Sequence, residues 1–508
     1  MDSLLSYIFY VIILWILIQS LFRSFGRSRK LFPPGPNPLP VVGNLFALGD
    51  KPHRSLTKLS QIYGPLMSLK LGRITTVVIS SSAMAKQVFQ THEQLFSNRP
   101  IPDAANADKH SESGMPWLPV SSMWKNLRKI SNSHLFSAKA LDASINLRQE
   151  KVLDLLNHVH KSAEAGEAVE IGRAGFKTVL NLLSTTFFDV DLADSSSDTA
   201  RELKDAVWNL MEEMGKPNVA DYFPLLRKID PQGRKRRATI NIRKFTDLLD
   251  LIINPRLGLK EVSPTTSPTE GKNNDLFATL INIMTISSGE IPKEDQLDKH
   301  KITHLLLDLL LAGIETISTT LEWSMAELLN NPEVMSKGRA ELEQVIGKGN
   351  QVQESDITRL PYLQAIVKET LRLHPALAVI PRKAEADVEI CGYVVPKGAQ
   401  VFINAWAIGR DPSIWDNPAK FRPERFLESN INVGGRTFEF VPFGGGRRIC
   451  PGLPLATRML HLMLASLLHS FVWKLEDGVT ADTMNMEDKF GLTVQLDQPL
   501  RARPIAIN

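Results

Sequence analysis

The sequence contains very little cysteine: Cys391 and Cys450 are the only two in 508 residues. This scarcity excludes a framework of disulfides and suits a reducing compartment. An excess of one charge is also missing, because 59 basic residues against 55 acidic ones leave a net charge of +4, too small and dispersed to indicate a nucleic-acid partner. The basic run 234–237 therefore indicates a solvated helix end or a membrane-facing loop. Internal repeats are absent, and the one low-complexity stretch, 262–271, is expected to be a mobile surface loop.

The N-terminal region holds an apolar run, 4–22, which carries no charge and would reach about 28 Å as a helix, close to the thickness of a bilayer core. Four basic residues follow within 23–30, so the positive-inside rule leaves the rest of the chain in the cytosol. Prolines then make 32–40 a stiff, extended elbow. The sequence thus predicts an uncleaved membrane anchor at 1–22, a basic stop-transfer and Pro-rich hinge at 23–40, and one large domain at 41–508.

Hydrophobic periodicity predicts that this domain is mainly helical, with small sheets. The expected helices are 150–160, 200–213, 243–253, 302–329, 363–373 and 454–471. Alternating segments 67–71 and 75–79, joined through Gly72, predict a β-hairpin. A second alternating run, 387–395, predicts a strand in which Cys391 is chemically inert.

The most informative segment is Phe443-Gly-Gly-Gly-Arg-Arg-Ile-Cys450-Pro-Gly452, a glycine-rich loop that runs into an apolar helix. A buried thiolate is stabilised when backbone N–H groups of a loop and of a helix N-terminus point at the sulfur. The glycines permit positive φ angles and a close approach to a flat ligand. Arg448 could pair with a carboxylate on that ligand, and Phe443 would keep water from the bond between sulfur and metal. The pattern therefore predicts a metal ligand, with a buried structural cysteine as the alternative.

Two charged patterns accompany this loop. Glu369 and Arg372 lie at i, i+3 in a helical stretch, and Arg425 follows in Pro423-Glu-Arg-Phe. Trp124 and Arg128 lie at i, i+4, which places an indole and a guanidinium on one helical face. In isolation, the first would be an ordinary surface ion pair and the second an ordinary stacked pair.

A third pattern interrupts the long apolar segment 303–329 with Ala312-Gly-Ile-Glu-Thr316. Glycine in mid-helix costs about 1 kcal/mol relative to alanine, so something should compensate for Gly313. A helix kink with a surface glutamate is the plain alternative.

In this order along the chain, the patterns resemble those of the cytochrome P-450 monooxygenases, in which the loop cysteine is the axial ligand of haem iron. The resemblance implies a mainly α fold, a helical haem domain with a minor β-rich lobe, behind an N-terminal transmembrane helix. It makes Cys450 the ligand of haem b and Phe443 a neighbour of the iron–sulfur bond. Haem propionates would be held by Trp124, Arg128, Arg382 and Arg448.

The same resemblance assigns the remaining patterns. Glu369, Arg372 and Arg425 form a buried structural network on the haem face. Gly313 and Ala312 leave room for O2, while Glu315 and Thr316 are the catalytic acid and alcohol that deliver protons to it. The sequence departs from the plant pattern at Ile314, commonly Thr, and at Glu315, commonly Asp, and both changes could alter proton delivery and substrate fit.

Electrons must come from a partner, because the sequence has no nicotinamide-binding fingerprint. The resemblance implies an NADPH-cytochrome P-450 reductase, and we expect it to dock on Lys125, Lys129 and Arg447 near the cysteine face. The elbow at 32–40 closely resembles the hinge of microsomal members, which implies the endoplasmic reticulum membrane, a single membrane pass and a cytosolic catalytic domain.

The substrate is expected to be a small apolar molecule. The sequence as a whole resembles the plant family of geraniol hydroxylases, sesquiterpene oxidases and ferruginol-type hydroxylases. This resemblance implies oxidation of a terpenoid. By matched position the pocket draws on the loop 101–119, on 377–380 and 492–494, and on the residues Asp308, Ala312, Ile314, Leu377, Ile380 and Leu492. Core packing is the alternative for each of these apolar residues.

Other functions remain open. A phenolic or alkaloid hydroxylase is the main competing interpretation of the substrate. An O2-independent haem-thiolate isomerase or dehydratase would not need Glu315 and Thr316. A non-enzymatic haem carrier or membrane scaffold would need none of the features of the 303–329 helix.

Overall fold

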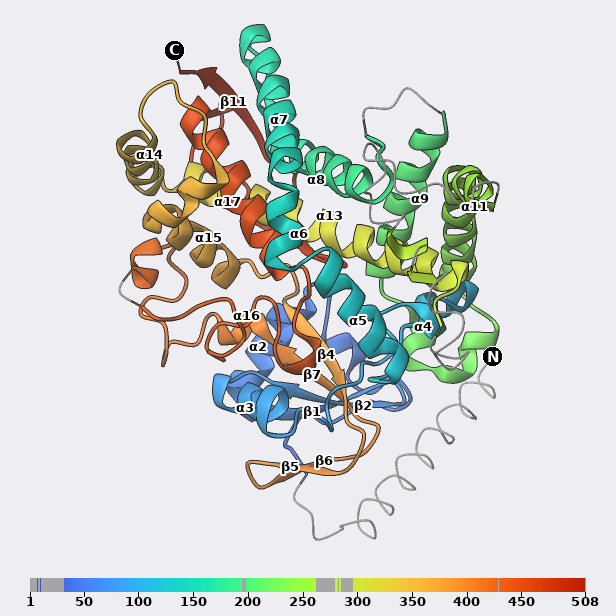
Figure 1. Cartoon of the computed structure of the whole chain (residues 1–508). Coiled ribbons are helices and arrows are strands. Elements are labelled where there is room, and N and C mark those ends of the chain that lie inside the picture. Colours follow the sequence, from blue (N-terminus) through green and yellow to red (C-terminus); the bar gives the residue numbers. More distant parts are fainter. Residues whose placement is uncertain are drawn as a thin grey trace.

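The computed structural model describes residues 7, 10, 32–193, 198–261, 279–281, 283–284, 296–427 and 429–507. Helices make up the upper part of the molecule and a small sheet lies below them (Figure 1). This arrangement is the mainly α fold with a minor β-rich lobe that the sequence predicts. The predicted anchor at 4–22, apart from Tyr7 and Tyr10, and the predicted loop at 262–271 lie outside the described residues.

The helices agree with the predicted ones in position and differ by several residues at their ends. They are α2 (Pro52–Tyr63), α3 (Ser82–Lys86), α4 (His110–Ser113), α5 (Ser122–His134), α6 (Ala138–Ala143), α7 (Ile145–Ala165), α8 (Ile171–Phe188), α9 (Asp198–Gly215), α10 (Val219–Tyr222), α11 (Arg234–Glu261), α13 (Lys299–Asn330), α14 (Pro332–Ile346), α15 (Pro361–Leu373), α16 (Ala405–Ile408) and α17 (Leu453–Ser470). Shorter helical turns are η1 (Leu45–Ala47), η2 (Gln87–Thr91), η3 (Asp103–Lys109), η4 (Pro224–Lys228), η6 (Glu354–Arg359), η7 (Pro423–Phe426) and η8 (Gly446–Arg448).

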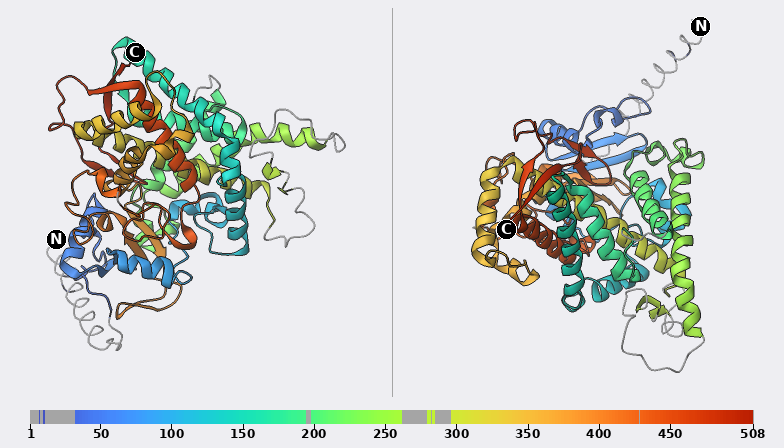
Figure 2. Two further views of the ribbon diagram at one scale, coloured as in Figure 1. Left: turned by 60° about the vertical axis from the view of Figure 1, so that its left-hand side comes forward. Right: turned by 90° about the horizontal axis from the view of Figure 1, so that it is seen from above.

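The core is organised around α13, which contacts α8, α9, α14, α15 and α17. The side chain of Asp298 accepts a hydrogen bond from the backbone N–H of Lys301 and so caps the start of this helix. Within the described residues, α13 is the one helix long and apolar enough to cross a membrane, and 83% of its apolar window is buried inside the protein. That burial is the pattern of a core helix, hydrophobic on all sides because it is surrounded. Figure 2 shows α11 along one side of the helical part.

The strands are β1 (Leu66–Leu71), β2 (Ile74–Ile79), β3 (Val169–Glu170), β4 (Val379–Lys383), β5 (Val388–Ile390), β6 (Tyr393–Val395), β7 (Gln400–Asn404), β8 (Phe471–Leu475), β9 (Asp488–Phe490), β10 (Val494–Leu496) and β11 (Arg501–Ala506). The main sheet has the order β1-β2-β7-β4, in which only the pairing of β2 with β7 is parallel. The predicted hairpin is confirmed as β1 and β2, with Leu66 opposite Ile79.

The proline-rich elbow lies against this sheet. The hydroxyl and the backbone N–H of Ser68 in β1 donate hydrogen bonds of 2.7 Å to the carbonyls of Pro33 and Pro34. Proline has no N–H of its own, so the elbow joins the sheet edge through its carbonyl groups.

The structure corrects one smaller prediction and decides between the two alternatives of another. The run 387–395 is not one strand, because Cys391 and Gly392 take φ angles of 49° and 80° and turn the chain into the hairpin of β5 and β6. Cys391 is exposed at that turn. The basic run 234–237 begins α11, where Arg234 and Arg237 both form ion pairs with Glu213, so it is a paired helix end rather than a loop.

Candidate active site

The loop before α17 presents the Cys450 sulfur to an internal cavity. The backbone N–H of Cys450 donates to the Phe443 carbonyl at 3.0 Å, which closes the loop. Burial raises the pKa of the Cys450 thiol, and this rise is opposed by backbone N–H groups of Gly452 and Leu453 that donate to the sulfur and by Arg128 and Arg99 nearby. The start of α17 thus provides the donors expected around a thiolate.

Gly446 shows why this loop needs glycine. Its φ is 65°, and a Cβ atom there would lie 2.6 Å from the Phe89 carbonyl oxygen of η2. The requirement therefore comes from the close approach of two backbone segments of the protein, in addition to any ligand.

A cavity of about 270 Å³ separates the Cys450 loop from α13. Phe443, Cys450 and Gly452 line it on one side, and Ala312 and Thr316 line it on the other. A larger cavity of about 630 Å³ lies between α7 and α14, but none of the predicted site residues borders it. Volume therefore does not identify the site here, whereas the thiol and the distal helix do.

Arg148, one of the arginines that line the Cys450 cavity, pairs with Glu354. The guanidinium groups of the other four, Arg99, Arg128, Arg382 and Arg448, gather at the cavity edge. Within the described part of the chain no carboxylate forms an ion pair with any of them. Burial and the neighbouring arginines lower the pKa of Arg448 to about 9 and place the pKa of Arg382 well below its usual range. Such a cluster of mutually repelling cations, two of them buried and two half-buried, is suited to a dianionic ligand, and the two propionates of haem meet that requirement.

Hydrogen bonds within the protein already hold the Arg448 guanidinium in place. Its Nε donates to the Ser97 carbonyl at 2.7 Å, and its other nitrogens donate to carbonyls of Met115, Pro116 and Leu118. Its guanidinium carbon also lies 4.9 Å from the centre of the Trp124 ring. Trp124 and Arg128, the predicted pair on α5, therefore have different partners: Trp124 lies against Arg448, whereas the Arg128 guanidinium donates to the Ile449 carbonyl at 2.5 Å.

Arg99 is a cavity residue that the sequence interpretation did not assign. It is half-buried, and its Nε is buried and has no hydrogen-bond partner among the described residues. A single arginine in an irregular loop carries no pattern of its own, so only the fold could bring it to the other three.

The distal side of the cavity is the middle of α13. The Thr316 hydroxyl borders the cavity and donates to the Ala312 carbonyl at 2.7 Å, one turn earlier. At Gly313 a Cβ atom would lie 2.7 Å from Leu183 Cδ1 of α8. Close packing of two helices therefore compensates for the mid-helix glycine, alongside its place on the cavity wall.

Glu315 does not border the cavity. Its Oε1 accepts hydrogen bonds of 2.7 Å from the Thr493 hydroxyl and from Gln495 of β10, while Oε2 has no partner among the described residues. Burial raises the pKa of this carboxyl, against the lowering effect of its donors. The structure therefore separates the two predicted catalytic residues: Thr316 faces the cavity and Glu315 faces β10.

Glu369, Arg372 and Arg425 meet in one buried network. Arg372 donates to both oxygens of Glu369, at 2.7 and 2.8 Å, and Arg425 donates to Oε1 at 3.0 Å. The backbone N–H of Arg422 is a further donor to Oε1, at 2.8 Å. Arg372 also donates to the Gly409 and Pro418 carbonyls, so the network joins α15 to the segment that leads to the cysteine loop.

The predicted pocket residues divide into two groups. Asp308, Ala312, Leu377 and Ile380 border the cavity. Ile314 is fully buried on another face of α13, and Leu492 is 38% exposed, so neither borders it. Leu182, Leu183 and Phe187 of α8 complete the wall, and the sequence interpretation had not included them.

A half-buried thiol that faces a cavity lined by arginines and by the long helix α13 is the arrangement expected of a haem-thiolate protein. The chain belongs to the cytochrome P450 family, whose model matches residues 33–500. It is 51% identical to geraniol 8-hydroxylase of Catharanthus roseus, over 95% of this chain and 96% of that protein. It is 48% identical to drimenol monooxygenase of Persicaria hydropiper (98% and 97% covered) and 45% identical to ferruginol synthase of Salvia miltiorrhiza (95% and 96% covered). The protein is therefore a monooxygenase with haem-thiolate chemistry.

Proposed function

We propose that this protein hydroxylates a terpenoid in plant specialised metabolism, using haem b bound through Cys450. The observation that carries the proposal is the cavity itself, which is lined by the Cys450 thiol, by α13 and by four arginines that have no acidic partner among the described residues. When bound, the haem supplies the activation of O2 and the oxidising power. The protein binds and orients the haem and the substrate, excludes water and supplies protons.

Each site residue has a proposed task. Cys450 holds the iron as thiolate, and Phe443 shields that bond from water. Arg382 and Arg448, with Trp124 and Arg128 on α5, hold the propionates. Glu369, Arg372 and Arg425 keep the loop before α17 in position through the network described above.

Proton supply is proposed to involve Thr316 and Glu315. Because the Thr316 hydroxyl lies on the cavity wall, it can donate a hydrogen bond inward if it releases the Ala312 carbonyl. Glu315 would act from behind the helix, where its carboxyl is held by Thr493 and Gln495.

The wall composition supports an isoprenoid substrate. Leucine and isoleucine side chains from α8, α13, α15, α17 and β4 line the cavity, and Asp308 is the acidic residue in its lining. Both Asp308 oxygens are engaged, since Oδ2 accepts from the Met115 N–H at 2.8 Å and Oδ1 lies 3.0 Å from His110 Nε2. A substrate would therefore be held by shape with few polar anchors. Three relatives carry the names of terpenoid oxidases, and a fourth, 47% identical, is a geranylhydroquinone 3''-hydroxylase of Arnebia euchroma, which keeps a phenolic substrate as the second candidate.

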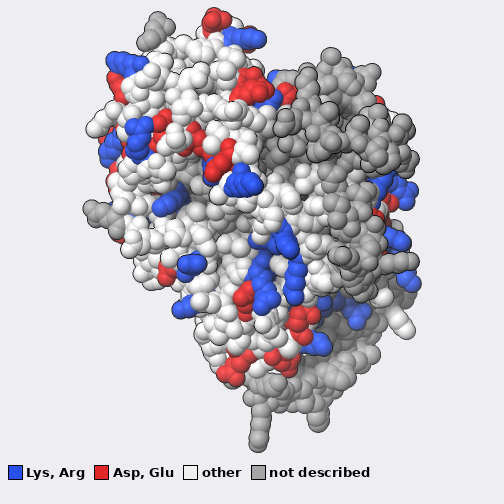
Figure 3. Space-filling model, viewed as in Figure 1, with Lys and Arg blue, Asp and Glu red and all other residues white. Residues whose placement is uncertain are grey.

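The proposed location is the endoplasmic reticulum membrane, with the catalytic domain in the cytosol and an NADPH-cytochrome P-450 reductase as partner. Lys125 and Lys129 are exposed on α5 and Arg447 is exposed next to the cysteine loop, where it pairs with Glu93 at 3.2 Å. Basic side chains gather over the position of α5 on this face of the molecule (Figure 3). This basic face is the proposed reductase-docking surface.

The cofactor assignment is tested with a pair of serine variants. Cys450→Ser should abolish the absorption near 450 nm of the reduced, carbonylated protein, because a thiolate ligand is required for that band. Cys391→Ser removes the exposed thiol and should leave the band unchanged. A 450 nm band in the Cys450→Ser protein would overturn the assignment.

The substrate class is tested by reductase-coupled turnover of geraniol, a sesquiterpene olefin, an abietane diene and a simple phenol, with products identified by mass spectrometry. Turnover of the phenol alone would reject the terpenoid assignment. For the reductase, Lys125→Glu with Lys129→Glu should slow reduction and leave the carbon monoxide spectrum intact. Lys474→Glu, an exposed lysine on β8, is the control, and equal reduction rates in both proteins would remove the docking surface.

A further inference from the structure

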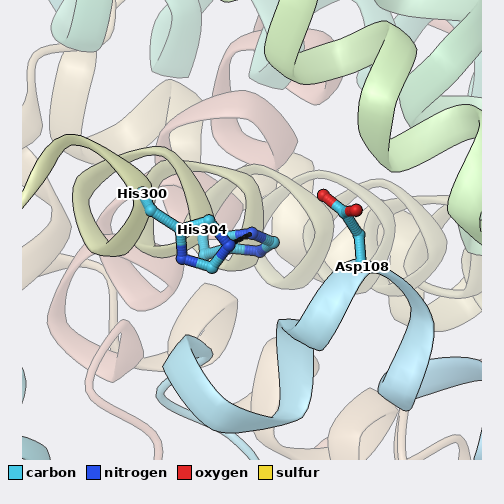
Figure 4. A group of neighbouring side chains, drawn as sticks. All are labelled: Asp108, His300 and His304. Atoms are coloured by element: carbon cyan, nitrogen blue, oxygen red, sulfur yellow. Dashed lines mark hydrogen bonds between the residues drawn. The ribbon is translucent and has the colours of Figure 1, made fainter.

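A cluster of imidazoles lies at the start of α13, outside the haem cavity. His300 and His304 are one turn apart on this helix, and His110 begins α4 beside them. His300 is exposed, whereas His304 and His110 are buried. Asp108, half-buried in η3, approaches from the other side. In Figure 4 the side chains of His300 and His304 overlap, and the Asp108 side chain extends from the neighbouring segment beside them.

The ligand-type atoms of Asp108, His300 and His304 all lie within 4.8 Å of one another. The two Nε2 atoms of the histidines are 3.0 Å apart. Tetrahedral zinc with Zn–N bonds of about 2.0–2.1 Å requires about 3.3 Å between two ligand nitrogens, so a few tenths of an ångström of opening suffices for this pair. Two histidines at i, i+4 on one helix face are a well-known arrangement for divalent metals.

The neighbours of His304 determine which of its ring nitrogens carries the lone pair that could bind a metal. Asp308 Oδ1 lies 3.0 Å from His110 Nε2, outside hydrogen-bond geometry, but an anionic oxygen at that distance still favours a proton on this nitrogen electrostatically. His110 Nδ1 is then the acceptor for His304 Nδ1–H, at 2.7 Å. His304 Nε2 is consequently the unprotonated nitrogen, and it faces His300 and Asp108. A carboxylate relayed through an imidazole is how metal-binding histidines are commonly oriented.

His300 can change tautomer without loss. With no metal, His300 Nε2–H donates to His304 Nε2. When a metal takes both Nε2 lone pairs, the proton moves to His300 Nδ1, where the Ser113 hydroxyl lies 3.1 Å away and can accept it. No proton needs to leave the cluster, because the histidine keeps one throughout.

From this geometry we propose that Asp108, His300 and His304 form a binding site for a divalent first-row transition metal such as Zn²⁺, completed by water on the exposed His300 side. The donor set of two imidazoles and one carboxylate, with an open position, suits zinc. The site lies one turn along α13 from Asp308, which borders the haem cavity, so the metal and the cavity share the His110–Asp308 contact. This proposal is independent of the oxygenase chemistry.

One cation competes for the site. Arg243 of α11 pairs with Asp108 at 3.1 Å. Zinc must displace Arg243 or share the Asp108 carboxylate with it. Two surface substitutions should therefore have opposite effects on the zinc affinity. His300→Ala removes a ligand, and Arg243→Gln releases one. Both side chains are exposed, so both variants are expected to fold.

The test is Zn²⁺ binding to the full-length, tag-free holoenzyme, measured by calorimetry and by equilibrium dialysis with metal analysis. We expect one saturable site, weakened on the order of tenfold or more in His300→Ala and in Asp108→Asn, tightened in Arg243→Gln, and changed by less than about twofold in His134→Ala, an exposed histidine at the end of α5. Zinc should also raise the unfolding temperature of the wild-type protein but not of His300→Ala.

X-ray absorption at the zinc edge should show nitrogen and oxygen ligands, including two imidazoles. Identical isotherms for wild type and His300→Ala, or an absence of saturable binding to wild type, would overturn the site. An unchanged isotherm for Asp108→Asn would overturn the participation of Asp108 and with it the three-ligand set, whereas an unchanged isotherm for Arg243→Gln would overturn the competition by Arg243.

Discussion

Replacement of Glu369 by glutamine should be among the most damaging single changes in the chain. The carboxylate is 0% exposed and accepts four hydrogen bonds, two from Arg372, one from Arg425 and one from the Arg422 backbone. Glutamine has the same shape but keeps one acceptor oxygen and turns an NH2 group toward guanidinium donors. The variant therefore buries guanidinium charge without its counter-ion.

The expected magnitude follows from the burial. Removing one partner of a buried ion pair costs about 3–5 kcal/mol, because the remaining charge is left uncompensated. A typical folded domain has only about 5–15 kcal/mol of net stability, so the variant should lose a large fraction of it. An exposed pair of the same length gives the contrast: Arg503 and Asp477 lie 2.7 Å apart with side chains 43% and 82% exposed, and such pairs contribute about 0–1 kcal/mol.

The assay is urea unfolding of Glu369→Gln and Asp477→Asn, followed by the haem absorption and by circular dichroism. We expect a lower midpoint and earlier haem loss in the first variant and a midpoint close to wild type in the second. If the two variants lose equal stability, burial does not decide the strength of this network and the reasoning is refuted. Should Glu369→Gln not fold, Arg425→Lys, which keeps the charge but loses the planar donor, should give an intermediate loss.

Three further predictions follow from buried groups. Burial raises the pKa of Glu322 to about 7, so the folded protein holds this proton more tightly than the unfolded chain, and the free energy of unfolding falls as pH rises from about 4.5 to about 7. Glu322→Gln should remove up to about 3 kcal/mol of that fall. Urea unfolding that shows the same loss of stability between these two pH values in both proteins would contradict the prediction. Gly313→Ala should push Leu183 into the cavity, alter product regiochemistry and cost about 1–3 kcal/mol, with Leu183→Ala restoring packing in a double-mutant cycle. Arg382→Met removes a buried cation, so the apoprotein should be no less stable while haem transfer to apomyoglobin accelerates on the order of tenfold; an unchanged transfer rate would exclude Arg382 from haem binding.

The sequence predicts the fold to the extent that local patterns determine it. The periodicity of 302–329 locates α13, and the alternation around Gly72 locates the hairpin of β1 and β2. It fails at 387–395, where the alternation continues through a turn: Gly392 is the one local signal of that turn, and the left-handed backbone of Cys391 next to it leaves no trace in hydrophobic period. Helix ends are missed by a few residues because capping by groups such as Asp298 lies outside the apolar pattern.

The site is predictable where each residue belongs to a motif and unpredictable where the fold alone brings residues together. Cys450 follows from its loop, and Glu369 and Arg372 from their spacing. Arg99 and Leu183 have no such signal, since one lies in an irregular loop and the other in an ordinary apolar helix. The metal cluster shows the same limit: the spacing of His300 and His304 is visible in the sequence, but Asp108 joins them only in the folded chain.

The direction of a side chain around a helix decides what a motif can do, and Glu315 and Thr316 illustrate this. Adjacent residues on an α-helix point about 100° apart, and the arc of α13 that lines the cavity includes Thr316 and Ile317 but ends before Glu315. On the side of α13 away from the cavity, Thr493 and Gln495 donate hydrogen bonds to the buried Glu315 carboxylate and hold it there. The extra methylene of glutamate relative to aspartate lengthens the reach toward β10. The acid is therefore coupled to the β9–β10 hairpin, and a carboxyl whose pKa burial already raises can exchange its proton on that side of the helix while Thr316 alone meets the substrate side.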